Sequence, residues 1–265
     1  MFSKFQLAKN YIRYYLSASN GKGHGVHSPF VFEFITKVLN DKTQYECYKA
    51  IEQQRQQLLQ NVAVIEVEDF GAGSSVMKSN KRIIKNIAAT SLKPKKFAQL
   101  LFRIVRYYQP GTIVELGTSL GITSCYLAKG NEKAHLYTCE GSGAIASIAQ
   151  KNFEDLQIKN ASLIQGDFAK TLPTLLSNIG QPDLIFIDGN HRKEPTLNYF
   201  HQLLQHANPC SILIFDDIHW SEEMEAAWHQ IQEHSAVTLT IDLFFIGLVF
   251  VNPGFKVTQH FTIRF

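Results

Sequence analysis

Short apolar runs rich in β-branched residues alternate with segments of helical periodicity from Thr112 onward. The runs with strand character are 112–116, 135–140, 161–167, 183–188 and 211–217. Strands that alternate with helices predict a parallel sheet covered by helices on both faces. Two later runs, 237–242 and 245–251, are too close together for a crossover helix, so we expect an antiparallel hairpin there. The alternation therefore predicts an α/β fold with a doubly wound, mostly parallel sheet of seven strands.

Acidic residues or glycines stand at the ends of the first five runs. Glu140 ends the second run, Asp188 ends the fourth, and Asp216 and Asp217 end the fifth. The carboxyl ends of parallel strands share one edge of a sheet, and ligands of open α/β sheets bind at that edge. We therefore expect the functional site at these strand ends.

The segment before this alternation has a helical character. Residues 2–16 are typical of a basic amphipathic helix, and Ser28 followed by Pro29 predicts the start of a helix that continues over 30–39. We therefore expect residues 1–95 to form a mostly helical N-terminal cap or substrate region.

The tail of the sequence returns to strand character. Residues 255–265 alternate apolar and polar side chains with one break at Gln259, which predicts an edge strand or an interface strand. An interface strand would make a homodimer. With this tail, the sheet domain is expected to cover residues 96–265.

Charge is distributed unevenly along the chain. Residues 1–110 contain 17 Lys and Arg against 7 Asp and Glu, whereas residues 111–265 contain 9 against 16. A basic segment attracts nucleic acid, an anionic membrane surface or an acidic substrate, or it is a solvated helical face beside an acidic region. The cations are dispersed and no nucleic-acid motif accompanies them, so nucleic acid is the disfavoured partner.

Two further observations concern location. The longest apolar stretch, 243–251, is shorter than the about 20 residues of a membrane-spanning helix, and the N-terminus has no apolar signal core. The four cysteines include no C-x-x-C pair, which argues against a disulfide framework or a structural zinc site. We expect a cytoplasmic protein without a membrane span.

The most specific local signal is the glycine turn at 113–123. Its order, E-L-G-T-S-L-G-I-T from Glu115, follows a buried strand and opens a helix. It lacks the G-x-G-x-x-G spacing of dinucleotide sites and the lysine of a P-loop, so a phosphate-gripping loop is disfavoured. A ligand that carries adenosine, no phosphate and a positive charge fits better, because Glu115 stands where the loop begins.

The order E-L-G-x-x-x-G-x-T resembles motif I of the class I S-adenosylmethionine-dependent methyltransferases, which have a Rossmann-like sheet. Residues 96–251 continue this resemblance, which is closest to the catechol and caffeoyl-CoA types of small-molecule O-methyltransferase. The resemblance implies S-adenosylmethionine (SAM) as cofactor. The implied cofactor-binding residues are Glu115, Gly117, Thr118, Ser119, Gly121, Thr123, Glu140, Gly141, Gly166, Asp167 and Asp188.

Several of these residues have expected roles. Glu140 ends the second strand 23 residues after Gly117, where a carboxylate accepts from both ribose hydroxyls. By resemblance, Asp167 lies at the adenine edge, Thr123 meets the methionyl carboxylate, and Glu115 faces the methionyl ammonium. The alternative for Glu140 is a solvated turn residue.

The residues expected to assist methyl transfer allow two mechanisms. In the metal-dependent O-methyltransferases that the chain resembles, a divalent cation lowers the pKa of the acceptor hydroxyl. Asp188, Asp216 and Asp217 stand at the places of its ligands, with Asp217 in place of an amide. Alternatively His191 acts as a general base, since histidine titrates near neutrality. A helix-capping surface histidine is the plain alternative for His191.

Three other features have weaker interpretations. The segment 69–74, D-F-G-A-G-S, is interpreted as a substrate loop or a plain turn. His24, His27 and His219 are not interpreted as a zinc cluster, because a zinc site needs more ligands at defined spacing, and His24 and His27 are interpreted as polar contacts that lead into the helix at Ser28. Trp220 is either a wall of the acceptor pocket or a core residue.

The sequence as a whole predicts an enzyme that transfers a methyl group from SAM to a hydroxyl of a small molecule. An anionic acceptor is expected from the basic N-terminal region. An N-methyltransferase acting on an amine, a peptide or RNA remains an alternative, because the cofactor half does not reveal the acceptor atom. A non-catalytic module that has kept the fold is a second alternative.

Overall fold

The computed structural model describes residues 1–67 and 80–265, so the segment 69–74 lies outside the described residues. The chain divides into two compact units. The middle unit comprises residues 42–178, and the terminal unit comprises residues 1–41 together with 179–265.

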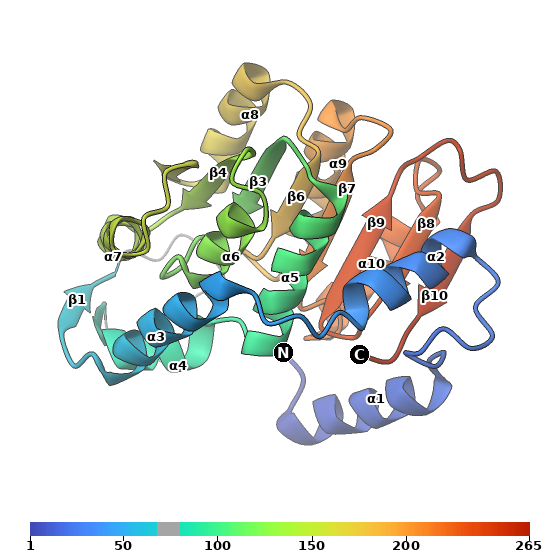
Figure 1. The fold of residues 1–265 in the computed structure, drawn as a ribbon, viewed down its shortest axis with the longest axis horizontal. Coiled ribbons are helices and arrows are strands. Elements are labelled where there is room, and N and C mark those ends of the chain that lie inside the picture. Colours follow the sequence, from blue (N-terminus) through green and yellow to red (C-terminus); the bar gives the residue numbers. More distant parts are fainter. Residues whose placement is uncertain (68–79) are drawn as a thin grey trace. The chain divides into compact units, whose positions relative to one another are not determined.

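The middle unit contains a parallel three-stranded part of the sheet, with its strands in the order β3-β4-β5 (Figure 1). Its elements are α3 (Glu46–Gln60), β1 (Val64–Glu66), β2 (Lys81–Ile83), α4 (Ile84–Ser91), α5 (Lys95–Tyr108), β3 (Thr112–Leu116), α6 (Ile122–Gly130), β4 (His135–Glu140), α7 (Gly143–Asp155), β5 (Ala161–Gln165) and α8 (Phe168–Ile179). The short strands β1 and β2 pair as a separate antiparallel ribbon. Crossover helices follow β3 and β4, as parallel pairing requires.

Aromatic packing holds the helices of the middle unit together. The Tyr48 ring on α3 lies against Phe102 on α5 and Tyr126 on α6, with ring centroids 5.0 and 5.5 Å apart. All three side chains are buried in one apolar cluster. The Tyr126 hydroxyl donates to Glu52 Oε1 at 2.9 Å, which satisfies its polar atom inside the cluster. Helix α3 of the N-terminal region is thereby anchored to the helix that follows the glycine turn.

The terminal unit contains five strands in the order β10-β8-β9-β7-β6. Its elements are α1 (Lys4–Ser17), α2 (Pro29–Phe34), the π-helix η1 (Ile35–Leu39), β6 (Leu184–Ile187), α9 (Lys193–His206), β7 (Ile212–Asp216), α10 (Glu222–Glu233), β8 (Leu239–Asp242), β9 (Ile246–Phe250) and β10 (Gln259–Thr262). Strands β6 and β7 are parallel, β9 runs antiparallel to both β7 and β8, and β10 is parallel to β8.

The predicted α/β fold is confirmed. The seven expected strands are present as β3 to β9, including the antiparallel β8–β9 hairpin. The tail adds β10 as an eighth strand, which stands at the end of the strand order and is the predicted edge strand. The described part of 1–95 is mainly helical, with residues 1–41 in the terminal unit and the rest in the middle unit. Its role as a cap and the boundary at residue 95 remain predictions.

Helix α1 packs against segments far away in the sequence (Figure 1). Tyr11 and Tyr14 contact Phe244 with ring centroids 5.1 and 5.2 Å apart, and the buried Tyr14 hydroxyl donates to the carbonyl of Ile263. The backbone of Ser19 also bridges in parallel to Ile263. The first helix is therefore held by the β8–β9 connection and by β10.

Other local expectations can be checked directly. The Ser28 hydroxyl accepts from the amide of Val31, and Pro29 is the first residue of α2, as predicted. All four cysteines are free. Among the described residues, no helix is both long enough and apolar enough to cross a membrane.

Candidate active site

The turn between β3 and α6 has an unusual backbone conformation with three positive φ angles. Gly117, Ser119 and Gly121 all have positive φ angles, of 106°, 48° and 78°. The amides of Gly117 and Thr118 donate to the carbonyl of Cys139 on β4, at 3.0 and 3.1 Å. A Cβ at Gly121 would lie 2.9 Å from Phe153 and 3.1 Å from Ala149 on α7. The loop is therefore fixed in a conformation that requires glycine at this position.

Hydroxyl groups hold the buried Glu115 beneath this loop. Glu115 is fully buried, and its Oε2 accepts from Thr138 at 2.6 Å and from Ser124. The Thr118 hydroxyl lies 2.5 Å from that of Thr138. This network joins β3, β4 and α6 around one carboxylate. The interaction of Glu115 with a methionyl ammonium remains a prediction.

Glu140 lies at the end of β4 with both carboxylate oxygens engaged by backbone amides. The Ser119 amide donates to its Oε2 at 2.9 Å, and the Ser142 amide donates to its Oε1 at 3.0 Å. Burial raises the pKa of Glu140, against the opposing effect of hydrogen bonds from the amides of Ser142, Ser119 and Gly141. Each carboxylate oxygen has a second lone pair, so the group is able to accept two further hydrogen bonds.

The end of β5 is also a tight turn. Gly166 has a φ of 143°, and its amide donates to the carbonyl of Glu140 at 2.9 Å. Asp167 Oδ1 accepts from the amide of Ala169 at 3.0 Å, so this carboxylate caps the start of α8. Thr123, by contrast, is buried in the first turn of α6. The predicted contacts of Asp167 and Thr123 with a cofactor remain predictions.

Two residues that hold the glycine turn, Asn152 and Ser91, were not predicted from the sequence. Asn152 on α7 is buried; its Nδ2 donates to the carbonyl of Leu120 at 2.7 Å, and its Oδ1 accepts from Gln54 on α3 at 2.7 Å. The Ser91 hydroxyl at the end of α4 lies 2.9 Å from that of Ser119. Their partners are distant in sequence, so no local pattern reveals these contacts.

A second polar group follows β6 and β7 in the terminal unit. Asp188, His191 and Asp216 each offer one ligand atom, and these atoms lie within 4.8 Å of one another. The Nε2 of His191 is 3.5 Å from Asp188 Oδ1. Asp216 is only 2% exposed, whereas the His191 side chain is 30% exposed. We call these three residues the carboxylate-histidine group.

Asp217 lies beside this group but is not one of the three grouped residues. Its Oδ2 is 3.9 Å from Nδ1 of His191, and its φ is 55°. His191 itself has a φ of 28°, and the preceding Asn190 has a φ of 66°. The Asn190 side chain donates to the Tyr199 hydroxyl on α9 at 2.5 Å, which holds this turn in place. Positive φ values at non-glycine residues often mark functional sites.

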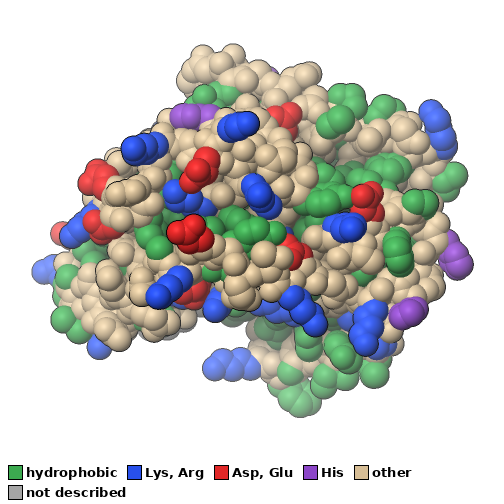
Figure 2. Space-filling model, viewed as in Figure 1, with side chains coloured by type: hydrophobic (Ala, Val, Ile, Leu, Met, Phe, Trp, Pro, Cys, Tyr) green, Lys and Arg blue, Asp and Glu red, His purple; other side chains and the backbone are tan. Residues whose placement is uncertain are grey.

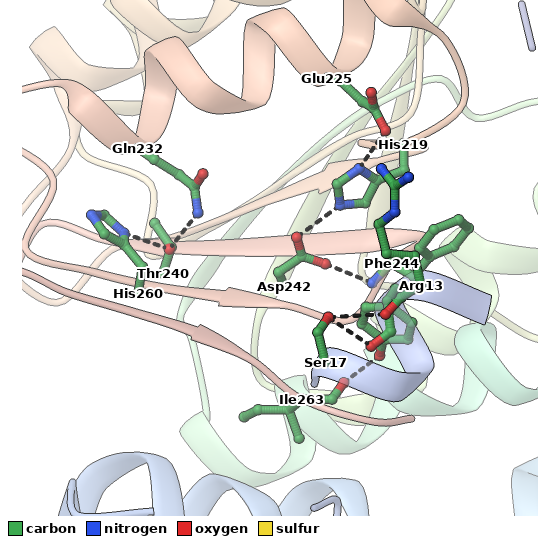
Figure 3. A network of polar contacts seen from close by, with 11 residues as sticks. Arg13, Ser17, His219, Glu225, Gln232, Thr240, Asp242, Phe244, His260 and Ile263 are labelled. Carbon is green, nitrogen blue, oxygen red and sulfur yellow. Dashed lines mark hydrogen bonds and ion pairs between the residues drawn. The ribbon is translucent and has the colours of Figure 1, made fainter. Parts of the chain in front are cut away.

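His219 belongs to a neighbouring network that includes neither His24 nor His27 (Figure 3). Its ring nitrogens lie 3.1 Å from Glu225 Oε1 and 2.8 Å from Asp242 Oδ2. The ring stacks on Phe244, with centroids 5.1 Å apart. His219 therefore links the segment after β7 to the end of β8. Trp220, the next residue, is partly buried and accepts from the Phe2 amide at 3.1 Å through its carbonyl.

Part of the chain matches known methyltransferases in sequence. The model of a methyltransferase domain family matches residues 114–218. A stretch of 100 residues is 30% identical to protein-L-isoaspartate O-methyltransferase from Chromobacterium violaceum. That match covers 38% of this chain and 40% of the relative, so it spans less than half of the relative's length.

Solved structures share the fold at low sequence identity. An O-methyltransferase from Bacillus cereus in complex with SAH has a TM-score of 0.56 and 19% identity, over 83% of this chain and 97% of that one. The O-methyltransferase TomG from Streptomyces achromogenes in complex with SAM has a TM-score of 0.56 and 17% identity, over 79% and 91% of the chains. An SAH-bound methyltransferase from Podospora anserina has a TM-score of 0.59 and 13% identity, over 95% and 97%.

The fold is that of a Rossmann-like class I methyltransferase. Residues 114–218 match the methyltransferase-domain family, in agreement with the motif that begins at Glu115.

Proposed function

We propose that this chain transfers a methyl group from SAM to a hydroxyl oxygen of a small molecule. The observation that carries the proposal is the carboxylate-histidine group at the ends of β6 and β7, which is suited to removing a hydroxyl proton. The methyltransferase-domain match and the O-methyltransferases among the similar structures support the same reaction.

The strand ends of the middle unit would bind the cofactor. When bound, SAM supplies a methyl group on a positively charged sulfur. Glu140 would accept from the two ribose hydroxyls, because its oxygens are already positioned by the amides of Ser119 and Ser142. The backbone of Gly117 lets the ligand approach closely. The buried negative charge of Glu115 complements a cationic ligand.

The carboxylate-histidine group fits two ways of removing the acceptor proton. Two carboxylate oxygens and an imidazole nitrogen within 4.8 Å are a suitable ligand set for a divalent cation such as Mg²⁺ or Mn²⁺. A cation held by Asp188, His191 and Asp216 would lower the pKa of the acceptor hydroxyl. Without a cation, His191 would take the proton while Asp188 orients the imidazole and stabilises its charged form. The carboxylate of Asp217, which lies near the other ring nitrogen, Nδ1, would then stabilise the same positive charge.

The charge of the N-terminal region favours an anionic acceptor. Residues 1–110 have an excess of ten basic over acidic residues. Local positive potential raises the concentration of anionic ligands. An acceptor that carries a carboxylate or a phosphate is therefore proposed over a neutral one, and equal turnover of matched neutral and anionic hydroxyl compounds would contradict this part.

The first experiment measures the thermal midpoint with SAH, with NAD as the control ligand. A ligand at 100 times its Kd stabilises a protein by about 2.7 kcal/mol, which is measurable for a chain of this size. Repeating the titration with MgCl₂ and with EDTA tests the carboxylate-histidine group, and Asp216→Asn is expected to abolish any magnesium effect. No shift with SAH, or a shift with NAD alone, would refute the cofactor assignment.

The second experiment identifies the acceptor atom. Radiolabelled SAM is incubated with hydroxyl compounds, amines, an isoaspartyl peptide and RNA, and the products are separated. Label in an alkali-stable ether of a hydroxyl compound supports the proposal. Label in an amine or in RNA supports the N-methyltransferase alternative, and an alkali-labile ester on the peptide supports the activity named for the Chromobacterium violaceum relative.

A further inference from the structure

Helix α1 has an apolar face that is exposed to solvent in the described part of the chain. Its inner face is formed by Leu7, Tyr11 and Tyr14, which pack on Phe244 and Phe245. A second set of apolar side chains points to solvent. These exposed side chains of α1 are Phe5, Ile12, Tyr15 and Leu16, with exposed fractions of 81%, 59%, 49% and 73%.

The exposed side chains form one continuous stripe. Residues of an α-helix follow one another at about 100°, so positions 5, 8, 12, 15 and 16 of α1 fall within an arc of about 100°. That arc is separate from the inner face, which centres about 120° away around the helix. Figure 2 shows hydrophobic side chains gathered over α1, with Lys or Arg side chains beside them. A contiguous exposed apolar patch of this kind marks an interaction site.

Cations border the stripe, and anions are absent from this part of the sequence. On the same helical projection, Lys4 lies along one edge and Lys9 along the other, with Arg13 beyond Lys9. Arg264 adds a further cation, because its guanidinium lies 4.9 Å from the centre of the Tyr15 ring. No Asp or Glu occurs in residues 1–32. The occupant of this face is therefore expected to be both apolar and negatively charged.

We propose that α1 is an interfacial helix that docks this enzyme on an anionic lipid bilayer. In that arrangement Phe5, Ile12 and Leu16 enter the boundary between headgroups and acyl chains, and Lys4 and Lys9 extend to the lipid phosphates on either side. Tyr15 would lie at the same boundary between headgroups and acyl chains, because aromatic rings with a polar end are favoured at membrane interfaces. Helix α1 remains folded on the terminal unit through Tyr11 and Tyr14, so docking requires no unfolding.

A second copy of the chain is a poorer occupant. Two α1 stripes packed face to face would bring Lys4, Lys9 and Arg13 of both copies together without an acidic partner from either helix. Like charges that face each other across an interface disfavour association. An acidic protein is the remaining alternative, and the test separates it from the bilayer.

The test is co-flotation of the full-length protein with vesicles of phosphatidylcholine, alone or mixed with phosphatidylserine. We expect flotation with the mixed vesicles, little with phosphatidylcholine alone, and loss of binding at high salt. Each cation near an anionic surface raises the membrane partition coefficient about fivefold. The double variant Lys4→Gln with Lys9→Gln should therefore bind the vesicles about thirtyfold more weakly. Phe5→Gln with Ile12→Gln and Leu16→Gln should weaken it by about tenfold or more.

Matched controls keep the result specific. Val62→Gln with Val64→Gln changes two other exposed apolar side chains, 69% and 60% exposed, and should leave flotation unchanged. Unaltered circular dichroism and Tm in the α1 variants show that the fold is retained. Absence of flotation with mixed vesicles, or equal flotation with neutral ones, would overturn the proposal. So would a dimer in sedimentation that the α1 variants dissociate, or a loss of flotation in the Val62 and Val64 control.

Discussion

Replacing Gly121 with alanine should destabilise the protein through crowding between the glycine turn and α7. Gly121 has a φ of 78°, and an added Cβ would lie 2.9 Å from Cε1 of Phe153, 3.1 Å from Cβ of Ala149 and 3.2 Å from Cα of Ala149. The last contact is with backbone, so a rotamer change does not relieve it. Gly180 provides a matched control, because its φ is 75° and a Cβ there meets nothing within 4 Å.

The size of the effect follows from comparing the two sites. An L-residue in the left-handed region costs roughly 1–2 kcal/mol, and this cost applies to Gly121→Ala and Gly180→Ala alike. Any change in the entropy of the unfolded chain is also shared. Overpacking adds about 1–3 kcal/mol at Gly121 alone. The free energy of unfolding should therefore fall by about 2–5 kcal/mol in Gly121→Ala, and by 1–3 kcal/mol more than in the control.

Urea unfolding followed by far-ultraviolet circular dichroism measures this difference. A thermal scan should show a lowering of Tm by about 5–15 °C for Gly121→Ala. Because Gly121 lies in the proposed cofactor loop, its alanine variant should also show a smaller shift of Tm with SAH, whereas Gly180→Ala should respond as the parent protein does. Equal destabilisation of the two variants would refute the argument that Phe153 and Ala149 require glycine here.

Four further predictions concern charged groups. Glu140→Gln should weaken SAH binding about tenfold to a hundredfold in a titration, because one of the two oxygens proposed to accept from the ribose hydroxyls is replaced by an amide nitrogen, which cannot accept. Because burial raises the pKa of Glu140, the parent protein should lose part of its stability as the pH rises through that pKa while SAH affinity increases; a pH series of Tm and Kd that matches that of the glutamine variant would contradict this. His191→Asn should abolish turnover yet leave SAH affinity unchanged, which unaltered kcat would disprove. Asp242→Asn should lower the free energy of unfolding by about 1–3 kcal/mol, because it weakens the 2.8 Å contact with His219; an unchanged urea midpoint would exclude that contribution.

The strands and their polar ends could be predicted because their signals are local. The run that ends in Glu140 lies next to the turn that it completes, and the β8–β9 hairpin follows from the short spacing between its strands. The candidate group at Asp188 and Asp216 follows from the rule that parallel strands share one edge. These inferences need only the order of residues along the chain.

Contacts between distant segments could not be predicted in the same way. Asn152 is separated from the carbonyl of Leu120 by 32 residues, and no pattern in either segment indicates that they meet. The parallel pairing of β10 with β8 likewise depends on the path of the intervening connection. The grouping of His191 with Asp188 and Asp216, in place of Asp217, depends on φ angles of 28° at His191 and 55° at Asp217. Homodimerisation through the tail remains a prediction that sedimentation would test.

The pairing of α1 with the last strand also constrains how the molecule is made. Tyr14 and its acceptor at Ile263 are 249 residues apart, so α1 leaves the ribosome well before its docking surface exists. At about 5–20 residues per second, synthesis of the intervening chain takes about 12–50 s. During that interval the tyrosines of the inner face are exposed together with the apolar stripe. The nascent helix is therefore a natural site for chaperone binding, and final docking of α1 is expected to be a late step of folding.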